Sequence, residues 1–224
     1  MELRIKNNTF LLLPQKAIYW KEEQIVLVSD LHIGKISHFR KAGIPVPNHG
    51  AHDNFRRLDE IIESTDPKHI LFVGDLFHSD VNREWDQFCT WRKQYPTIKM
   101  DIVLGNHDYL PDDFCTNYQI DIYPTELIIG PFTFAHHPRE EFVNDNEYVI
   151  SGHIHPVVSL SGLARQYVTV PCFYFGVQQA ILPSFGYFTG GYAIDIEETD
   201  TVIAVAEKKL YPVQLKAETS RLGV

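Results

Sequence analysis

Cysteine is scarce in this sequence and follows no pattern. The 224 residues contain three cysteines, Cys89, Cys115 and Cys172. An odd, unpatterned set of thiols argues against a disulfide framework and against a zinc knuckle, and is typical of reduced thiols. We therefore expect a cytoplasmic protein.

Long apolar runs and positive charge are also scarce. The longest apolar run near the N-terminus covers residues 10–13, and the polar residues 6–8 interrupt any early signal segment. A bilayer span needs roughly 20 apolar residues, so we expect no membrane contact. Lys and Arg number 20 against 29 Asp and Glu, a formal net charge of −9. This balance excludes a broad basic face that wraps nucleic acid, but it is compatible with a nuclease whose acidic site holds cations.

The first half of the chain predicts a regular succession of strands and helices. Apolar runs at residues 24–29, 69–73 and 98–104 predict strands buried on both faces. Residues 51–63 and 84–95 carry apolar side chains at helical spacing, and we expect the aromatic residues of the second helix to lie in the core. This alternation indicates crossover units and a largely parallel sheet.

Three further expectations concern the rest of the chain. Residues 3–20 predict two short strands, and the prolines at 45 and 47 predict an extended loop over residues 33–50. Short strands between residues 126 and 206, including one at 191–196, predict a mostly antiparallel sheet. We find no repeat and no low-complexity linker, so we expect a single domain over residues 1–224 with two sheets face to face.

Polar clusters follow five of the apolar runs. They are Asp30-x-His32, Gly74-Asp75, Gly105-Asn106-His107-Asp108, His136-His137 and Gly152-His153-x-His155. Each cluster alone is compatible with an ordinary turn, but their conjunction at strand ends is not, because strand ends on one edge of a layered fold converge. Carboxylate, amide and imidazole ligands together suit Mn²⁺, Fe or Zn²⁺, and there are too many for one ion. Two ions, roughly 3.5–4 Å apart, need a bridging carboxylate.

This combination resembles the calcineurin-like metallophosphoesterase superfamily. The resemblance implies an α/β fold, a four-layer αββα sandwich of two facing mixed β-sheets, with a dinuclear metal site. It assigns Asp30, His32, Asp75 and His155 to one metal and Asp75, Asn106, His136 and His153 to the other, with Asp75 bridging. His137 is the alternative to His136, which we favour because the family's ligand directly follows the strand. The resemblance also implies that His107 protonates the leaving oxygen or stabilises the phosphoryl group and that Asp108 orients its ring.

The metal pair carries the expected reaction. Two divalent cations, most simply Mn²⁺, lower the pKa of a bridging water and align a phosphate ester for in-line attack by hydroxide. We therefore expect a hydrolase that forms no covalent intermediate.

The loops narrow the resemblance further. Residues 30–35, 38–47, 74–79, 136–138 and 182–191 are similar to the ligase-associated DNA damage response endonuclease (PdeM) family, with Ser184 at a position where a small residue is expected. This resemblance implies a metal-dependent phosphodiesterase or endonuclease acting on DNA, in repair, beside an ATP-dependent DNA ligase and a helicase.

The sequence indicates the residues that contact the substrate less clearly than it indicates the metal ligands. We expect Arg40, His78 and Arg83 to contact the substrate, with Lys35 and Lys41 in the same basic rim; solvated loop charges are the alternative. A small-molecule phosphoesterase or pyrophosphatase acting on nucleotides would use the same metal site. A non-catalytic scaffold that has lost its metals is disfavoured because every candidate ligand is present.

Overall fold

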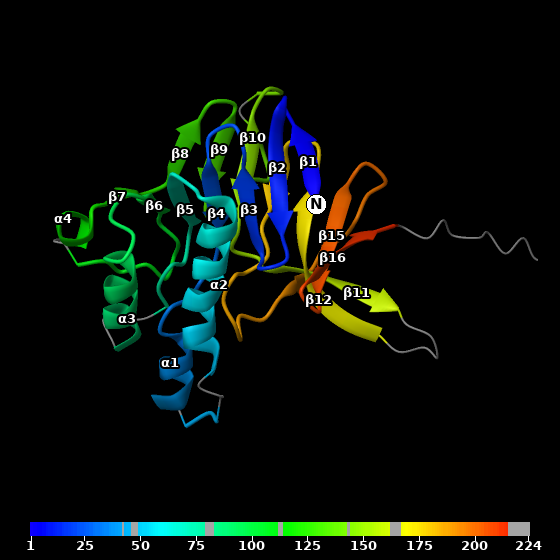
Figure 1. Ribbon diagram of the computed structural model, residues 1–224. Coiled ribbons are helices and arrows are strands. Elements are labelled where there is room, and N and C mark those ends of the chain that lie inside the picture. The colour runs from blue at the N-terminus through cyan, green and yellow to red at the C-terminus, as the bar shows by residue number, and fades with distance from the viewer. Residues whose placement is uncertain are drawn as a thin grey trace, which may run out of the picture.

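The structure is a computed structural model that describes residues 1–41, 43–45, 49–78, 83–111, 114–142, 144–161 and 167–214. Its first sheet has seven strands in sequence order (Figure 1). The neighbouring pairs from β1 to β4 are antiparallel, and those from β4 to β7 are parallel. The strands are β1 (Glu2–Ile5), β2 (Asn8–Leu13), β3 (Ala17–Trp20), β4 (Ile25–Val28), β5 (His69–Val73), β6 (Lys99–Val103) and β7 (Ile120–Tyr123).

The second sheet has nine strands. Five of its eight strand pairs are antiparallel, as expected, but β9 and β13 each run parallel to β10. This local parallel pairing brings the carboxyl ends of β9 and β10 to one edge. The strands are β8 (Glu126–Ile129), β9 (Phe132–Ala135), β10 (Tyr148–Ser151), β11 (Pro156–Ser161), β12 (Tyr167–Phe175), β13 (Gln179–Ile181), β14 (Tyr192–Ala193), β15 (Thr201–Ala206) and β16 (Lys209–Val213).

The sheets share one core, and helices cover the other face of the first sheet. Alternate residues of a strand point to opposite faces. In β5, accordingly, Leu71 and Val73 pack with Phe134 between the sheets, while Phe72 packs with Phe88 beneath the helices. The helices are α1 (Lys35–Lys41), α2 (His49–Thr65), α3 (Arg83–Arg92) and α4 (Phe114–Tyr118). In the described part of the chain, no helix is both long and apolar enough to cross a membrane.

The α/β sandwich of two facing mixed sheets is confirmed. Within the described ranges, the helices all precede β7, so the outer face of the second sheet carries no helix there. Ile194 and Ile196 cover that face instead, packing with Cys172 and Val202. Figure 1 shows β11 and β12 extending away from the body of the sandwich.

Three local expectations were wrong. The N-terminal stretch forms three strands rather than two, and the strand expected over residues 191–196 is reduced to the two residues of β14. Residues 35–41, expected as loop, form α1. The helix has no acidic residue in its own first turn; Glu84 of α3 accepts hydrogen bonds from the amides of Gly34 (2.7 Å) and Ser37 (3.1 Å) instead. Such a cap is invisible to local sequence reasoning because it comes from a distant residue.

Candidate active site

The predicted metal ligands all follow strands that end at one edge of the sandwich. Backbone hydrogen bonds extend the parallel pairing past the strands: the amide of Asp30 donates to Gly74 (3.1 Å) and that of His32 to Asp75 (2.9 Å). The amide of Gly152 donates to His136 (3.1 Å), which does the same for the second sheet. The two sheets therefore present their strand-end loops to each other.

Five of the seven predicted ligands have a left-handed backbone. Their φ angles lie between 44° and 69° at Asp30, His32, Asp75, His153 and His155. Such a conformation costs a residue with a Cβ about 1–3 kcal/mol and persists only where the surroundings impose it. Five instances at one edge indicate a site built for chemistry rather than for stability.

Glycines let these side chains approach the neighbouring backbone. A Cβ on Gly74 would overlap the ring of His136, and one on Gly105 would overlap the carboxylate of Asp75. A Cβ on Gly152 would overlap Ser29 and Asp30. The glycines of the motifs therefore make room for the polar side chains of neighbouring strands.

The first predicted ligand set is assembled. Nε2 of His32 lies 3.2 Å from Nε2 of His155, which lies 3.4 Å from Oδ1 of Asp30. Oδ2 of Asp75 is 3.8 Å from Nε2 of His32. The other ring nitrogen of His155 is 2.9 Å from the carbonyl of Thr189, a contact that makes Nδ1 the donor and leaves the Nε2 lone pair facing the carboxylates.

The second predicted set shares the same carboxylate oxygen. Nε2 of His136 lies 3.5 Å from Oδ2 of Asp75, 3.0 Å from Oδ1 of Asn106 and 3.1 Å from Nδ1 of His153. The ring of His137 packs against that of His153, and His137 is exposed. His136 is buried and faces Asp75, so the geometry favours it over His137.

The protonation states of the clustered side chains favour the binding of cations. Burial and the neighbouring Asp30 raise the pKa of Asp75 to about 6. Burial lowers the pKa of His136 to about 4 and also lowers that of His32. The site therefore combines neutral imidazoles, an amide oxygen and two carboxylates whose acceptor atoms face one another. Nε2 of His136 faces Asp75 and Asn106, and Nδ1 of the same ring lies 4.0 Å from Oδ1 of Asp30. This donor set fits a pair of divalent cations.

His107 lies beside the first set, and Asp108 supports the loop beneath it. The ring of His107 is 4.8 Å from that of His78 and 5.7 Å from that of His32, centre to centre. The carboxylate of Asp108 accepts hydrogen bonds from the amides of Phe77 (2.8 Å) and Gly105 (2.9 Å). Both oxygens thus hold backbone, so Asp108 positions the loop that carries His107; that it also orients the ring of His107 stays a prediction.

The residues expected to contact the substrate differ in their burial and in their distance from the ligand sets. His78 is half-buried, with Nδ1 3.2 Å from Nδ1 of His32. Arg40 is exposed on α1, and the side chain of Arg83 lies outside the described residues. Lys35 is half-buried, and its charge lowers the pKa values of His32 and His107, after burial itself.

The sequence predicted no role in the metal site for two serines near Asp30. The hydroxyl of Ser29 lies within hydrogen-bond distance of the carboxylate of Asp30 and of the carbonyl of Val73 and can donate its one proton to either, and the hydroxyl of Ser184 donates to the carbonyl of Asp30 (2.9 Å). A hydroxyl directly before Asp30 was a usable signal. Ser184 lies 154 residues away along the chain, so sequence spacing offered none.

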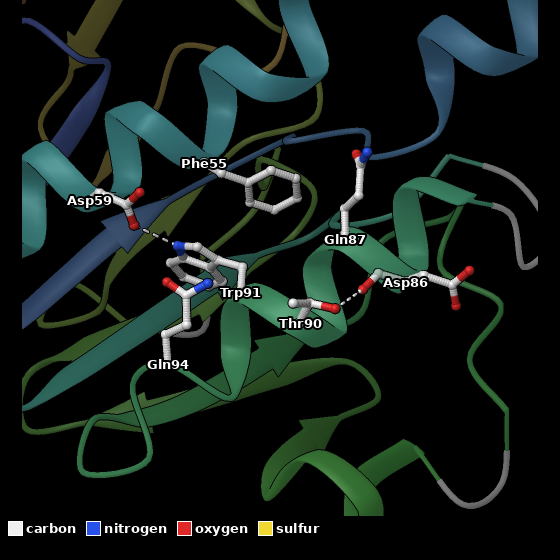
Figure 2. Close-up of a pocket in the computed structure, with 7 residues that line it drawn as sticks. All are labelled: Phe55, Asp59, Asp86, Gln87, Thr90, Trp91 and Gln94. Atoms are coloured by element: carbon white, nitrogen blue, oxygen red, sulfur yellow. Dashed lines mark hydrogen bonds between the residues drawn. The ribbon is translucent and has the colours of Figure 1, made fainter.

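Two surface grooves are candidates for binding the substrate. One, of about 410 Å³, is lined by Asn106, His136, His137 and Arg139, next to the second ligand set. The other, of about 480 Å³, lies between α2 and α3, where Phe55 faces Trp91 and Trp91 donates to Asp59 (2.7 Å) (Figure 2). None of the predicted ligands lines this helical groove, whereas Asn106 and His136 line the strand-end groove.

Comparisons with known proteins identify the family of this chain. The family model of the calcineurin-like phosphoesterases matches residues 24–211. The crystal structure of the Pseudomonas putida nuclease MPE is 25% identical, covers 95% of this chain and 99% of its own, and superposes with a TM-score of 0.78.

Two more distant structures are also similar. The phosphoesterase YfcE from E. coli is 14% identical over 84% of this chain and 97% of its own, with a TM-score of 0.48. The Aquifex aeolicus protein AQ665, of unknown function, is 15% identical over 58% and 78%, with a TM-score of 0.42. No curated protein sequence matches. Because the family model covers most of the sequence, this chain belongs to the calcineurin-like phosphoesterases, hydrolases that act on ester bonds.

Proposed function

We propose that the protein is a metal-dependent phosphodiesterase that cuts DNA. The observation that carries the proposal is the position of Asp75, whose Oδ2 lies within 3.5–3.8 Å of a nitrogen from each ligand set. A carboxylate placed in this way suits a bridge between two cations. The likeness to the MPE nuclease supports a nucleic acid as substrate.

The proposed ligands are Asp30, His32, Asp75 and His155 for one ion and Asp75, Asn106, His136 and His153 for the other. Two divalent cations, with Mn²⁺ preferred over Fe or Zn²⁺, would supply Lewis acidity and an activated water. The chain's own groups then bind and orient the ester. Burial and Lys35 lower the pKa of His107, which makes its protonated ring a stronger acid toward the leaving oxygen, and the same N–H can stabilise the phosphoryl oxygens.

The substrate path is proposed from charge and shape. Lys35, Arg40 and His78 are proposed to contact the phosphates of the substrate, as is Arg83, whose side chain lies outside the described residues, and the groove lined by Asn106 and His136 would hold the adjoining part of the substrate. We propose that a single domain, acting in the cytoplasm, performs this reaction in DNA repair with an ATP-dependent DNA ligase and a helicase. Strands from both halves of the chain share the inter-sheet core, which supports the single domain.

A second candidate is a small-molecule phosphoesterase acting on nucleotides. The volume of the groove, about 410 Å³, falls among pockets that hold small ligands, and the net charge of −9 disfavours long polyanions.

The test compares substrates with and without the bridging carboxylate. Single-stranded DNA, nucleotides and an aryl phosphodiester are assayed with Mn²⁺, for the parent protein and for Asp75→Asn. We expect Mn²⁺-dependent cleavage of DNA by the parent alone. Faster turnover of nucleotides than of DNA would support the second candidate. An Asp75→Asn variant as active as the parent would refute both.

A further inference from the structure

A cationic cavity lies close to the proposed metal centre but is separate from it. It has a volume of about 190 Å³ and is formed by the β2–β3 turn, α2, Tyr187 and the strands β12 and β15. Its lining contains four basic residues, Lys16, Arg56, Arg57 and Lys208, against one carboxylate, Glu60. Such a concentration of positive charge is unexpected in a chain of net charge −9.

Lys16 is the least compensated of these cations. Its Nζ donates to the carbonyl of Gly186 (3.2 Å) and lies 5.6 Å from the centre of the Tyr187 ring. Among the described residues, no carboxylate lies within ion-pair distance of Nζ. An ammonium has three donors, so two are left for the cavity. Burial, and then the charge of Arg57, lower the pKa of Lys16 to about 7, which measures how poorly its charge is solvated.

The other basic groups form the wall. Arg57 pairs with the carboxylate of Asp53 (3.2 Å), donates to the carbonyls of Gln15 (3.2 Å) and Phe185 (2.5 Å), and stacks on the Phe185 ring at 4.0 Å. Arg56 pairs with Asp53 and Glu60. Asp53 offsets part of the charge of Arg57, but Lys16 beside it has no carboxylate within ion-pair distance among the described residues, and an anion in the cavity would stabilise its charge.

We propose that this cavity binds a phosphate group. Its volume lies below the roughly 300–1,000 Å³ of pockets for drug-sized ligands, which suits one small anion rather than a whole nucleotide. Lysine binds phosphate as a point charge and arginine through its planar fork. The group can be inorganic phosphate or a backbone phosphate of a nucleic-acid strand.

The segment that closes the cavity also holds the backbone at the metal centre. The amide of Gly186 donates to the carbonyl of Asp30 (3.0 Å) and that of Phe185 to Ser29 (2.8 Å), while the carbonyls of Phe185 and Gly186 accept from Arg57 and Lys16. Lys16 and Arg57 therefore hold the carbonyls of the same segment whose amides bind the backbone of Ser29 and Asp30.

The first test reads Lys16 directly. The Mn²⁺-loaded protein is acetylated with a lysine-selective reagent in inorganic phosphate or in chloride of equal ionic strength, and each lysine is quantified by peptide mass spectrometry. We expect saturating phosphate to slow the acetylation of Lys16 about tenfold, because an amine that is bound to an anion does not react. Lys21, which is exposed and pairs with Glu2, is the internal control and should not respond.

A third arm with a single-stranded oligonucleotide separates the two sources. Protection by phosphate identifies a free anion as occupant, and protection by the oligonucleotide alone identifies a strand phosphate. An acetylation rate of Lys16 that is the same in all three solutions would overturn the proposal. The readout needs no hydrolysis, so its failure is distinct from failure of the proposed function.

The second test uses variants. Phosphate is titrated calorimetrically into Asp75→Asn, which removes the proposed metal-bridging group, and into the same variant carrying Lys16→Met or Lys16→Arg. We expect Lys16→Met to weaken binding about tenfold and Lys16→Arg, which keeps the charge, to retain it. Equal affinity for the Lys16→Met protein, with its fold verified by circular dichroism, would refute the site.

Discussion

The first sheet holds a buried aspartate beside a buried histidine at two places, and the two pairs differ in their charge balance. Asp101 of β6 lies 3.1 Å from Nε2 of His69 and accepts from Lys99 at 2.6 Å. Asp75, just after β5, lies 3.5 Å from Nε2 of His136. Both carboxylates face the space between the two sheets.

The pKa values move in opposite directions. Burial would raise the pKa of Asp101, but the contacts with His69 and Lys99 outweigh it and hold the pKa below its usual value. Burial and Asp30 raise the pKa of Asp75 to about 6. The backbone differs as well, because Asp75 is left-handed and Asp101 lies inside a strand. A buried carboxylate that is paired with a cation of the protein, such as Asp101, belongs to the folded framework. A buried carboxylate without such a partner, such as Asp75, is a candidate for binding a metal ion.

Of the substitutions considered, Asp75→Asn should have the largest effect on activity. We expect hydrolysis of an aryl phosphodiester in Mn²⁺ to fall about 10³-fold or more, because one oxygen of the proposed bridge becomes an uncharged amide. Mn²⁺ should also cease to raise the melting temperature, which for the parent reflects binding to the folded state alone. Retained activity together with retained stabilisation by Mn²⁺ would show that Asp75 is no ligand.

His107→Gln should reduce cleavage by about 10²–10⁴-fold for DNA, whose alkoxide leaving group needs a proton. The loss should be much smaller for an aryl phosphodiester with a good leaving group. Steady-state rates on the two substrates give the comparison, and calorimetry should find Mn²⁺ affinity unchanged. An equal loss on both substrates would contradict proton donation and favour stabilisation of the phosphoryl group.

Gly74→Ala separates crowding at the site from backbone strain. Gly74 and Gly43 have the same φ of +79°, but a Cβ on Gly74 would overlap His136, whereas nothing lies within 4 Å of one on Gly43. We expect Gly43→Ala to cost about 1–2 kcal/mol in the free energy of unfolding. Gly74→Ala should cost more and lower Mn²⁺ affinity about tenfold or more. Denaturant titration and calorimetry check both; equal effects would mean that contact with His136 is unimportant.

Asp101→Asn should have the smallest effect on activity, and it distinguishes a carboxylate that stabilises the fold from one that takes part in the reaction. We expect turnover close to that of the parent, but a free energy of unfolding lower by about 1–3 kcal/mol, because a buried, hydrogen-bonded charge is lost. Lost turnover at unchanged stability would reverse the roles assigned to the two carboxylates.

The pH dependence of the two variants should also be opposite. The pKa of folded Asp101 is depressed, so its contribution is present above the unfolded value of 3.8 and is lost as pH falls through the folded pKa. The pKa of folded Asp75 is raised, so its contribution is present below 3.8 and is lost as pH rises through about 6. In metal-free protein, Asp75→Asn should therefore gain stability over the parent between pH 4 and 7, and Asp101→Asn should approach the parent in acid. Unfolding curves across this range give both signs.

Much of the fold was predictable because its signals are local. Apolar runs and helical spacing indicated β4 to β6, α2 and α3 at close to their observed bounds. The errors fall where a distant residue decides local structure. Helix α1 depends on Glu84, and the parallel pairing of β9 with β10 depends on the crossing of the chain between them.

By itself, the sequence determined which residues are available for chemistry: the carboxylates, the amide and the histidines of the strand-end motifs, and the glycines that leave room for them. Only the tertiary structure decided their partners. It placed one oxygen of Asp75 between two ligand sets, turned Asp108 to the backbone, and set Lys16 beside Arg57 behind the segment that braces Asp30. The physical reason is that a motif specifies side chains along the chain, whereas distance, burial and charge between motifs arise when strand ends from both sheets meet.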